Sequence, residues 1–131
     1  MNISDYLRTS LLNHSLGVVA FTMPTTVWAA LYSSPPPTSA GGGTEVTAAD
    51  YARVSTTWDT AAVGVISNAT PIRFPSTGTT LSNWGTVLGV GLFASPTGGN
   101  LLFYGPLSAA VTLSAGSDFQ LAASTLSITI S

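Results

Sequence analysis

The chain contains very little charge. Its 131 residues include three basic and five acidic side chains, so charged residues make up 6% of the sequence, against about 25% in an average soluble domain. All three basic residues are arginines, and lysine is absent. The net charge is −2, and the sequence has no basic patch of the kind that nucleic-acid-binding proteins use. We therefore expect no nucleic-acid partner.

Cysteine is absent and histidine occurs once, at His14. These absences exclude disulfides, zinc–thiolate sites and thiol chemistry, and they leave a histidine-based triad without evident partners. The glycine run Gly41–Gly43 invites comparison with a phosphate loop, but that loop needs a lysine after its last glycine. We expect no catalytic residue, no cofactor and no metal, and we interpret the protein as non-enzymatic. His14 and Arg8 are interpreted as solvated or capping residues.

Long hydrophobic runs are also missing. The longest apolar run, Leu16 to Phe21, is far shorter than the roughly 20 residues that a membrane-spanning helix needs. The beginning of the sequence lacks the basic and apolar regions of a signal peptide. We therefore expect no membrane span and no signal peptide. Disorder is disfavoured as well, because 45% of the residues are hydrophobic and the mean hydropathy is +0.43.

Serine and threonine replace charge as the polar residues, with 36 in the chain. Short β-prone segments alternate with turn signals at intervals of about ten residues. This pattern predicts an all-β protein, an antiparallel β-sandwich or jelly-roll-like fold of about eight strands with one short N-terminal helix. At this length, residues 1–131 are expected to form a single domain.

The helix is predicted within residues 1–17. Ser4 is a good N-cap, and Asp5 complements the helix dipole in the first turn. Leu7, Leu11 and Leu12 fall on one apolar stripe, while Gly17 can end the helix in a left-handed conformation. We expect this stripe to pack on the strands of its own sandwich or on a neighbouring subunit.

A long loop over residues 34–50 contains three stiff prolines and three flexible glycines. Residues 47–50 are predicted to form one helical turn within it. The remaining chain is divided into short segments, of which 18–21 is a strand or an extended arm and the others are predicted strands: 25–33, 51–58, 61–67, 69–74 and 107–113. Residues 119–130 supply the last strands, with a turn predicted at residues 123–124.

Three of the eight charges, Glu45, Asp50 and Arg53, lie within nine residues. They could form an acid/base site or a salt bridge. We favour the salt bridge, in which Arg53 ties the loop to the following strand through a carboxylate. If exposed, such a bridge contributes about 1 kcal/mol or less.

The stretch Asn83–Pro106 is predicted to be the hairpin around which the fold is organised. Its two arms are apolar at nearly every position, which indicates burial on both faces, or burial of one face by another protein. Gly89 and Gly91 leave two positions on one face without side chains. We expect the Trp84 ring to pack over this gap.

So little charge leaves whole interface-sized surfaces uncharged. We therefore predict a homo-oligomer, with a trimer favoured. The candidate interface combines the helix stripe with the apolar second arm of the hairpin: Leu7, Leu11, Leu12, Leu101, Leu102, Phe103 and Tyr104.

Several segments, in order along almost the whole chain, carry a resemblance to a known family. The most specific are GTEV with YAR, followed by NWGTV, GLF and GGNLLFYG. With these segments the chain resembles a widespread family of small tailed-phage virion proteins, variously labelled tail, tail-fibre or structural proteins. The resemblance implies a virion component that is assembled in the host cytoplasm and whose partners are other virion proteins, either the major capsid protein or tail proteins.

Two classes of function then compete. The first is a structural protein, most simply a capsid decoration or cement subunit, because a compact uncharged sandwich suits a surface cap; the alternative within this class is a tail-associated adaptor or fibre subunit. The second class is a receptor- or carbohydrate-binding module. That function requires Trp28, Trp58 or Trp84 to form an exposed platform, whereas core packing is the simpler expectation for each of them.

Overall fold

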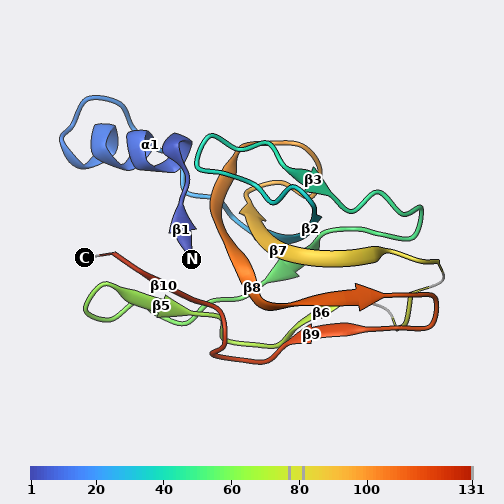
Figure 1. Ribbon diagram of the computed structural model, residues 1–131. Coiled ribbons are helices and arrows are strands. Elements are labelled where there is room, and N and C mark those ends of the chain that lie inside the picture. Colours follow the sequence, from blue (N-terminus) through green and yellow to red (C-terminus); the bar gives the residue numbers. More distant parts are fainter. Residues whose placement is uncertain (77, 81, 131) are drawn as a thin grey trace.

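The computed structural model describes residues 1–76, 78–80 and 82–130. Within these residues it contains one N-terminal helix and ten mostly short strands (Figure 1). Every strand pairing in the described ranges is antiparallel. The predicted all-β class with one N-terminal helix is confirmed.

The main sheet is six-stranded and is built around the predicted hairpin. Strands β7 and β8 form the two arms of this hairpin, and the sheet order is β1-β8-β7-β2-β3, with β4 also paired to β2. The predicted strand 107–113 is the continuation of the second arm. The bounds are β1 Asn2–Ile3, β2 Val27–Ser33, β3 Thr44–Glu45, β4 Val54–Thr56, β7 Gly85–Phe93 and β8 Leu101–Leu113.

Two small ladders form a second layer beneath the main sheet (Figure 1). One joins β5 (Val65–Ser67) to β10 (Ser127–Thr129), and the other joins β6 (Ile72–Phe74) to β9 (Phe119–Leu121). The larger core cluster joins the layers, because it combines residues of β2 and β7 with Ile72, Phe74 and Ile128. The arrangement is therefore a small sandwich with one wide and one divided layer.

Helix α1 spans Asp5–Ser15 and begins as predicted. The Ser4 hydroxyl accepts a hydrogen bond from the Leu7 amide at 3.1 Å and itself donates to the carbonyl of Leu101. The Ser4 amide donates to the Leu102 carbonyl at 2.9 Å. One buried side chain thus caps the helix and fixes it to β8, which explains why α1 projects from the hairpin at one end of the molecule (Figure 1).

The predicted packing of Trp84 over the hairpin glycines is wrong. A Cβ at Gly91 would lie 2.9 Å from the Tyr32 ring and 3.0 Å from a Leu101 methyl. These side chains belong to a smaller cluster, separate from the core cluster that contains Trp84. The reason is the alternation of a strand, which places Gly91 and its two neighbours Val90 and Leu92 on opposite faces of the sheet.

Other segments are shorter than predicted. Residues 18–21 are not a strand. The helical turn predicted at residues 47–50 is absent; instead a turn over residues 48–51 is closed by a hydrogen bond of 3.0 Å from the Tyr51 amide to the Ala48 carbonyl. The predicted strands 51–58, 61–67 and 69–74 shrink to β4, β5 and β6, and the last strands become the short β9 and β10, with the predicted turn at residues 123–124 between them. Each retains only the residues that find a partner strand.

Candidate functional site

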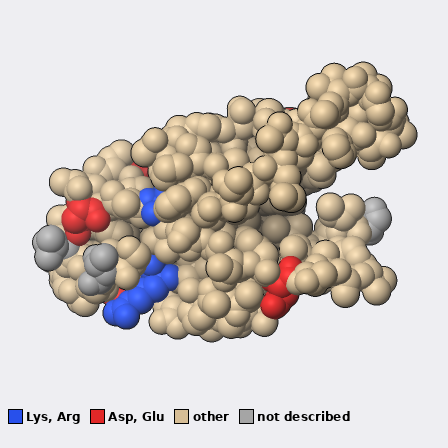
Figure 2. Space-filling view, turned by 180° about the vertical axis from the view of Figure 1, so that it is seen from behind, with Lys and Arg blue, Asp and Glu red and all other residues tan. Residues whose placement is uncertain are grey.

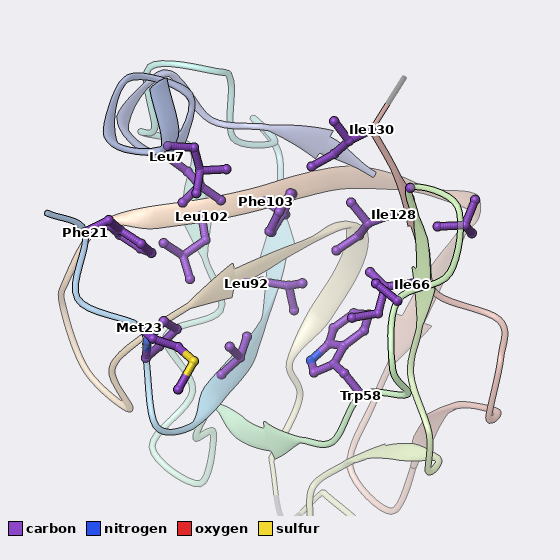
Figure 3. A pocket seen from close by; sticks show the side chains of 16 residues that line it. Leu7, Phe21, Met23, Trp58, Ile66, Leu92, Leu102, Phe103, Ile128 and Ile130 are labelled. Carbon is purple, nitrogen blue, oxygen red and sulfur yellow. The ribbon is translucent and has the colours of Figure 1, made fainter. Parts of the chain in front are cut away.

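An apolar groove opens between two projecting parts of the molecule, helix α1 with the segment after it and the β5–β10 ladder. A cavity of about 530 Å³ opens between helix α1, the main sheet and the β5–β10 ladder (Figure 3). Every residue that lines it is apolar. We call this set the apolar groove: Leu7, Leu11, Phe21, Met23, Pro24, Val27, Trp58, Ala61, Gly64, Val65, Ile66, Leu92, Leu102, Phe103, Ile128 and Ile130.

A β-bulge shapes the floor of the groove. Leu92 pairs with Phe103 and the next residue, Phe93, pairs with Leu101, so Leu102 is an extra residue on β8. A bulge redirects side chains that would otherwise alternate between the two faces. As a result, the consecutive residues Leu102 and Phe103 both line the groove beside Leu92 (Figure 3).

The first wall is formed by α1 and the segment that follows it. Leu7 is buried and Leu11 is half-buried, and both face the groove. Residues 16–24, which we call the arm, leave the helix without forming a strand, and Phe21 and Met23 of the arm extend this wall. The arm is held against the helix because the Phe21 amide donates to His14 Nδ1 at 3.0 Å. His14 therefore has a structural contact instead of the solvated position that was one expectation.

The second wall is the β5–β10 ladder. Ile66 and Ile128 are directly paired across its two strands and both line the groove. Trp58 lies beside them, half-buried, with its indole N–H donated to the Thr56 hydroxyl at 2.8 Å. At the tip of the ladder Val63 is fully exposed, with φ of 51°, a backbone region that β-branched residues rarely adopt.

The residues that line this groove carry no charge, although the exposed pair of Asp5 and Arg8 lies on helix α1. All three arginines pair with carboxylates of the same chain: Arg8 with Asp5 at 2.7 Å, Arg53 with Glu45 at 2.9 Å, and Arg73 with Asp118 at 3.5 Å. Seen from behind, the two projecting parts are almost entirely uncharged, and the arginines in view lie at the other end of the molecule (Figure 2). The surface around the groove is therefore suited to an uncharged partner.

The predicted salt bridge of the long loop is confirmed. Arg53 makes two bonds of 2.9 Å to the Glu45 carboxylate and donates to the carbonyls of Ser95 and Gly98 at 3.0 and 2.7 Å. Its guanidinium also lies 3.7 Å from the centre of the Phe93 ring. Arg53 thus joins the loop to the tip of the β7–β8 hairpin.

This ion pair is more buried than expected, since the side chains of Arg53 and Glu45 are only 7% and 27% exposed. Burial on its own raises the pKa of Glu45, but the hydrogen bonds from Arg53 and Tyr51 outweigh it and hold the pKa below its ordinary value. Burial, reinforced by the Glu45 charge, raises the pKa of Tyr32 to about 12 and also raises that of Tyr51. The cluster is thus a structural joint, in which each charge is matched by a partner.

The third charge, Asp50, does not join this cluster. It accepts hydrogen bonds from the Ser82 hydroxyl and, at 3.0 Å, from the indole N–H of Trp84. The Trp84 ring is buried and packs edge-on against Tyr51, with a centroid distance of 5.2 Å. None of the three tryptophans is exposed: Trp84 is buried, and Trp28 and Trp58 are half-buried.

The residues of the predicted interface are spread over several environments. Leu7, Leu101 and Leu102 are buried within the subunit, Leu11, Phe103 and Tyr104 are half-buried, and Leu12 is 58% exposed. Four of them, Leu7, Leu11, Leu102 and Phe103, border the apolar groove. Their contact with another subunit stays a prediction.

The interface predicted from the sequence did not include the second wall of the groove. Val65, Ile66 and Ile130 line the groove, yet each belongs to a short strand or turn segment that was assigned to the sheet alone. The signal that could have indicated them is the apolar segment around Val63, which lies in a turn where polar residues are the rule.

Comparison with known proteins gives the family. The family model described as podophage GP4 fiber I protein gp80 matches residues 2–129. The chain belongs to this family. The resemblance to small tailed-phage virion proteins is thereby confirmed, and the chain is a structural component of a phage virion. No curated protein matches it significantly.

The described residues contain no group of three or more acidic or histidine side chains placed to hold a metal ion. No helix within them has the length and apolar character needed to cross a membrane.

Proposed function

We propose that the chain is a fibre subunit of a podophage tail, a non-enzymatic structural protein that joins its neighbours through uncharged apolar surfaces. The family description supports this assignment, because it names a fibre protein. It favours the tail alternative over capsid decoration, which the compact uncharged composition had suggested.

The apolar groove is the observation that supports association of the chain with its neighbours through apolar surfaces. Apolar burial is the main non-directional driving force for association, and, unlike the attraction between exposed charges, it is not weakened by salt screening. None of the residues that line the groove is charged, so their burial against a partner would require no charge of the lining to be desolvated.

The location can be tested by counting and imaging. We expect purified virions to contain far fewer copies of this chain than of the major capsid protein, and an antibody or a fused tag to label the tail. A copy number comparable with that of the major capsid protein, with labelling over the capsid surface, would support capsid decoration and refute the fibre assignment.

A further inference from the structure

A second hollow lies between helix α1 and the arm. Its volume is about 290 Å³, close to the lower end of the range of about 300–1,000 Å³ that is typical of ligand pockets. The helix contributes Tyr6, Ser10 and Asn13, and the arm contributes residues 19–22. The three helix residues are spaced by four and three positions, which places them on one face of α1. We call this second site the polar hollow.

The walls of the polar hollow are held together by hydrogen bonds between the arm and the helix. The amides of Val18 and Val19 donate to the Asn13 carbonyl at 2.8 and 3.2 Å. The Phe21 amide donates to His14 Nδ1 at 3.0 Å. These bonds fix the arm along the helix without a ligand, and a site that is already formed loses less conformational entropy when it binds.

Four polar side chains in the lining are unused. They are the hydroxyl groups of Tyr6, Ser10 and Thr22 and the side-chain amide of Asn13. Within the part of the chain that the structure describes, none of these groups makes a hydrogen bond to another residue. Each hydroxyl can donate one bond and accept others, while the amide offers two donors and an acceptor oxygen. An apolar ligand would leave the half-buried Ser10 and Asn13 without partners, which is unfavourable.

The polar hollow also contains an accessible aromatic ring but no charge. Tyr6 is 44% exposed, and its ring offers an apolar face with a hydroxyl group at one end. Val19, Ala20 and Phe21 add apolar surface opposite the helix residues. Since no lining residue is charged, an anionic or cationic ligand would find no opposite charge there. The lining therefore fits a neutral ligand that is rich in hydroxyl groups.

We propose that the polar hollow binds a neutral saccharide. Sugar hydroxyls both donate and accept hydrogen bonds, which matches the lining hydroxyls and the Asn13 amide. The C–H face of a sugar ring carries slightly positive hydrogens, and the face of an aromatic ring is negative, so the sugar can pack on Tyr6. The sequence analysis considered only tryptophans as a sugar platform, whereas the accessible ring of this site is a tyrosine. The inference goes beyond the proposed function, because it gives the chain a ligand as well as a structural role.

The test titrates the isotope-labelled full chain with glucose, galactose, mannose and N-acetylglucosamine and follows its amide NMR signals. At least one sugar should shift the signals of residues 6–22 until they saturate. For a ligand of about twelve non-hydrogen atoms we expect a Kd on the order of millimolar. A blocked glycine–serine dipeptide at the same concentrations tests whether the hollow prefers a peptide.

Variants connect the binding with the lining. Tyr6→Ala removes the ring and should weaken binding at least about tenfold, whereas Tyr6→Phe keeps the ring and should lose less. Thr22→Val removes one hydroxyl at nearly constant shape and should weaken binding about two- to tenfold. Thr9→Val is the matched control, because Thr9 is exposed on α1 but does not line the hollow. It should bind like the wild type, and thermal melts check that each variant is folded.

Three results would overturn the inference: no saturating shift with any of the four sugars, shifts that lie outside residues 6–22, or equal affinities of Thr22→Val and Thr9→Val. Saturation by the dipeptide alone would assign the hollow to a peptide and would overturn it as well. The location of the chain is tested separately. A chain on the tail that binds no sugar would refute only this inference, and a sugar-binding chain on the capsid surface would refute only the fibre assignment.

Discussion

The joint between Glu45 and Arg53 provides the sharpest quantitative prediction. Glu45→Gln removes the charge that the buried guanidinium faces, while the side chain keeps almost the same shape. Arg53 is 7% exposed, so its positive charge cannot be fully solvated by water after the change. One amide oxygen can still accept a hydrogen bond from Arg53, which limits the loss.

Breaking a buried ion pair costs about 3–5 kcal/mol, and a hydrogen bond to a charged group contributes about 1.5–3 kcal/mol. Since Glu45 keeps 27% of its surface exposed and Gln retains one bond, we expect Glu45→Gln to lower the free energy of unfolding by about 2–3 kcal/mol. For a domain of this size, each kcal/mol shifts Tm by about 3–5 °C.

The matched control is Asp118→Asn. Its partner Arg73 lies 3.5 Å away, and the two side chains are 51% and 48% exposed. Exposed pairs contribute about 1 kcal/mol at most, so the control should melt within a few degrees of the wild type. Thermal melts and urea titrations of the three proteins measure the difference.

The effect of Glu45→Gln should depend on pH. The pKa of Glu45 is lower in the folded chain than in the unfolded chain, so its contribution to stability is present above the unfolded value of about 4.3. It is lost as the pH falls through the folded value, because the unfolded state then binds more protons. The difference in the free energy of unfolding between the wild type and Glu45→Gln should therefore decrease as the pH is lowered. The structural role of the Glu45–Arg53 pair would be refuted if Glu45→Gln had the same Tm as Asp118→Asn at neutral pH. It would also be refuted if the difference in unfolding free energy between the wild type and Glu45→Gln did not change with pH.

The remaining predictions concern the core and the tyrosines. Gly91→Val forces a branched side chain against the Tyr32 ring, and urea unfolding should show a loss of about 1–3 kcal/mol, smaller than the roughly 3–5 kcal/mol for Trp84→Ala; an unchanged stability of Gly91→Val would mean that the space beside Gly91 is not filled. Leu7→Ala should lose about 2–5 kcal/mol because Leu7 is 4% exposed, whereas Leu12→Ala, at 58%, should stay within about 0.5 kcal/mol; equal losses would contradict the orientation of the helix. In an ultraviolet titration Tyr32 should ionise near pH 12, and because its folded pKa is raised, its contribution to stability should disappear as the pH rises from about 10 through that value; ionisation of every tyrosine near pH 10 would contradict its burial.

Local signals in the sequence predicted the elements that depend on near neighbours. The Ser4 cap and the β7–β8 hairpin are encoded within a few residues of each position, and the structure confirms both of them. The predicted stripe holds for the buried Leu7 and the half-buried Leu11 but not for Leu12, which is 58% exposed. The pairing of Glu45 with Arg53 was also predictable, because few charges exist in this chain and these two are close in sequence.

The burial of that pair was not predictable, and neither was the position of Trp84. Both depend on which face of the sheet a residue occupies, and a shift of one residue in the pairing reverses that face. Asn68 shows the same limit: it is completely buried, and its side-chain amide donates hydrogen bonds to the carbonyls of Thr70 and Ala122. No periodicity in the sequence marks a contact with a residue so distant.

By itself, then, the sequence determined the all-β class, the helix, the central hairpin and the low content of charged residues. It also showed a family resemblance that predicts a virion protein. The tertiary structure alone decided the apolar groove, because its lining comes from α1, the arm, three strands of the main sheet and both strands of the β5–β10 ladder. The bulge at Leu102 and the pairing of Ile66 with Ile128 bring these segments together. Such pairings are set by the packing of the whole chain, because residues far apart in sequence meet only after the two layers of the sandwich have closed on each other.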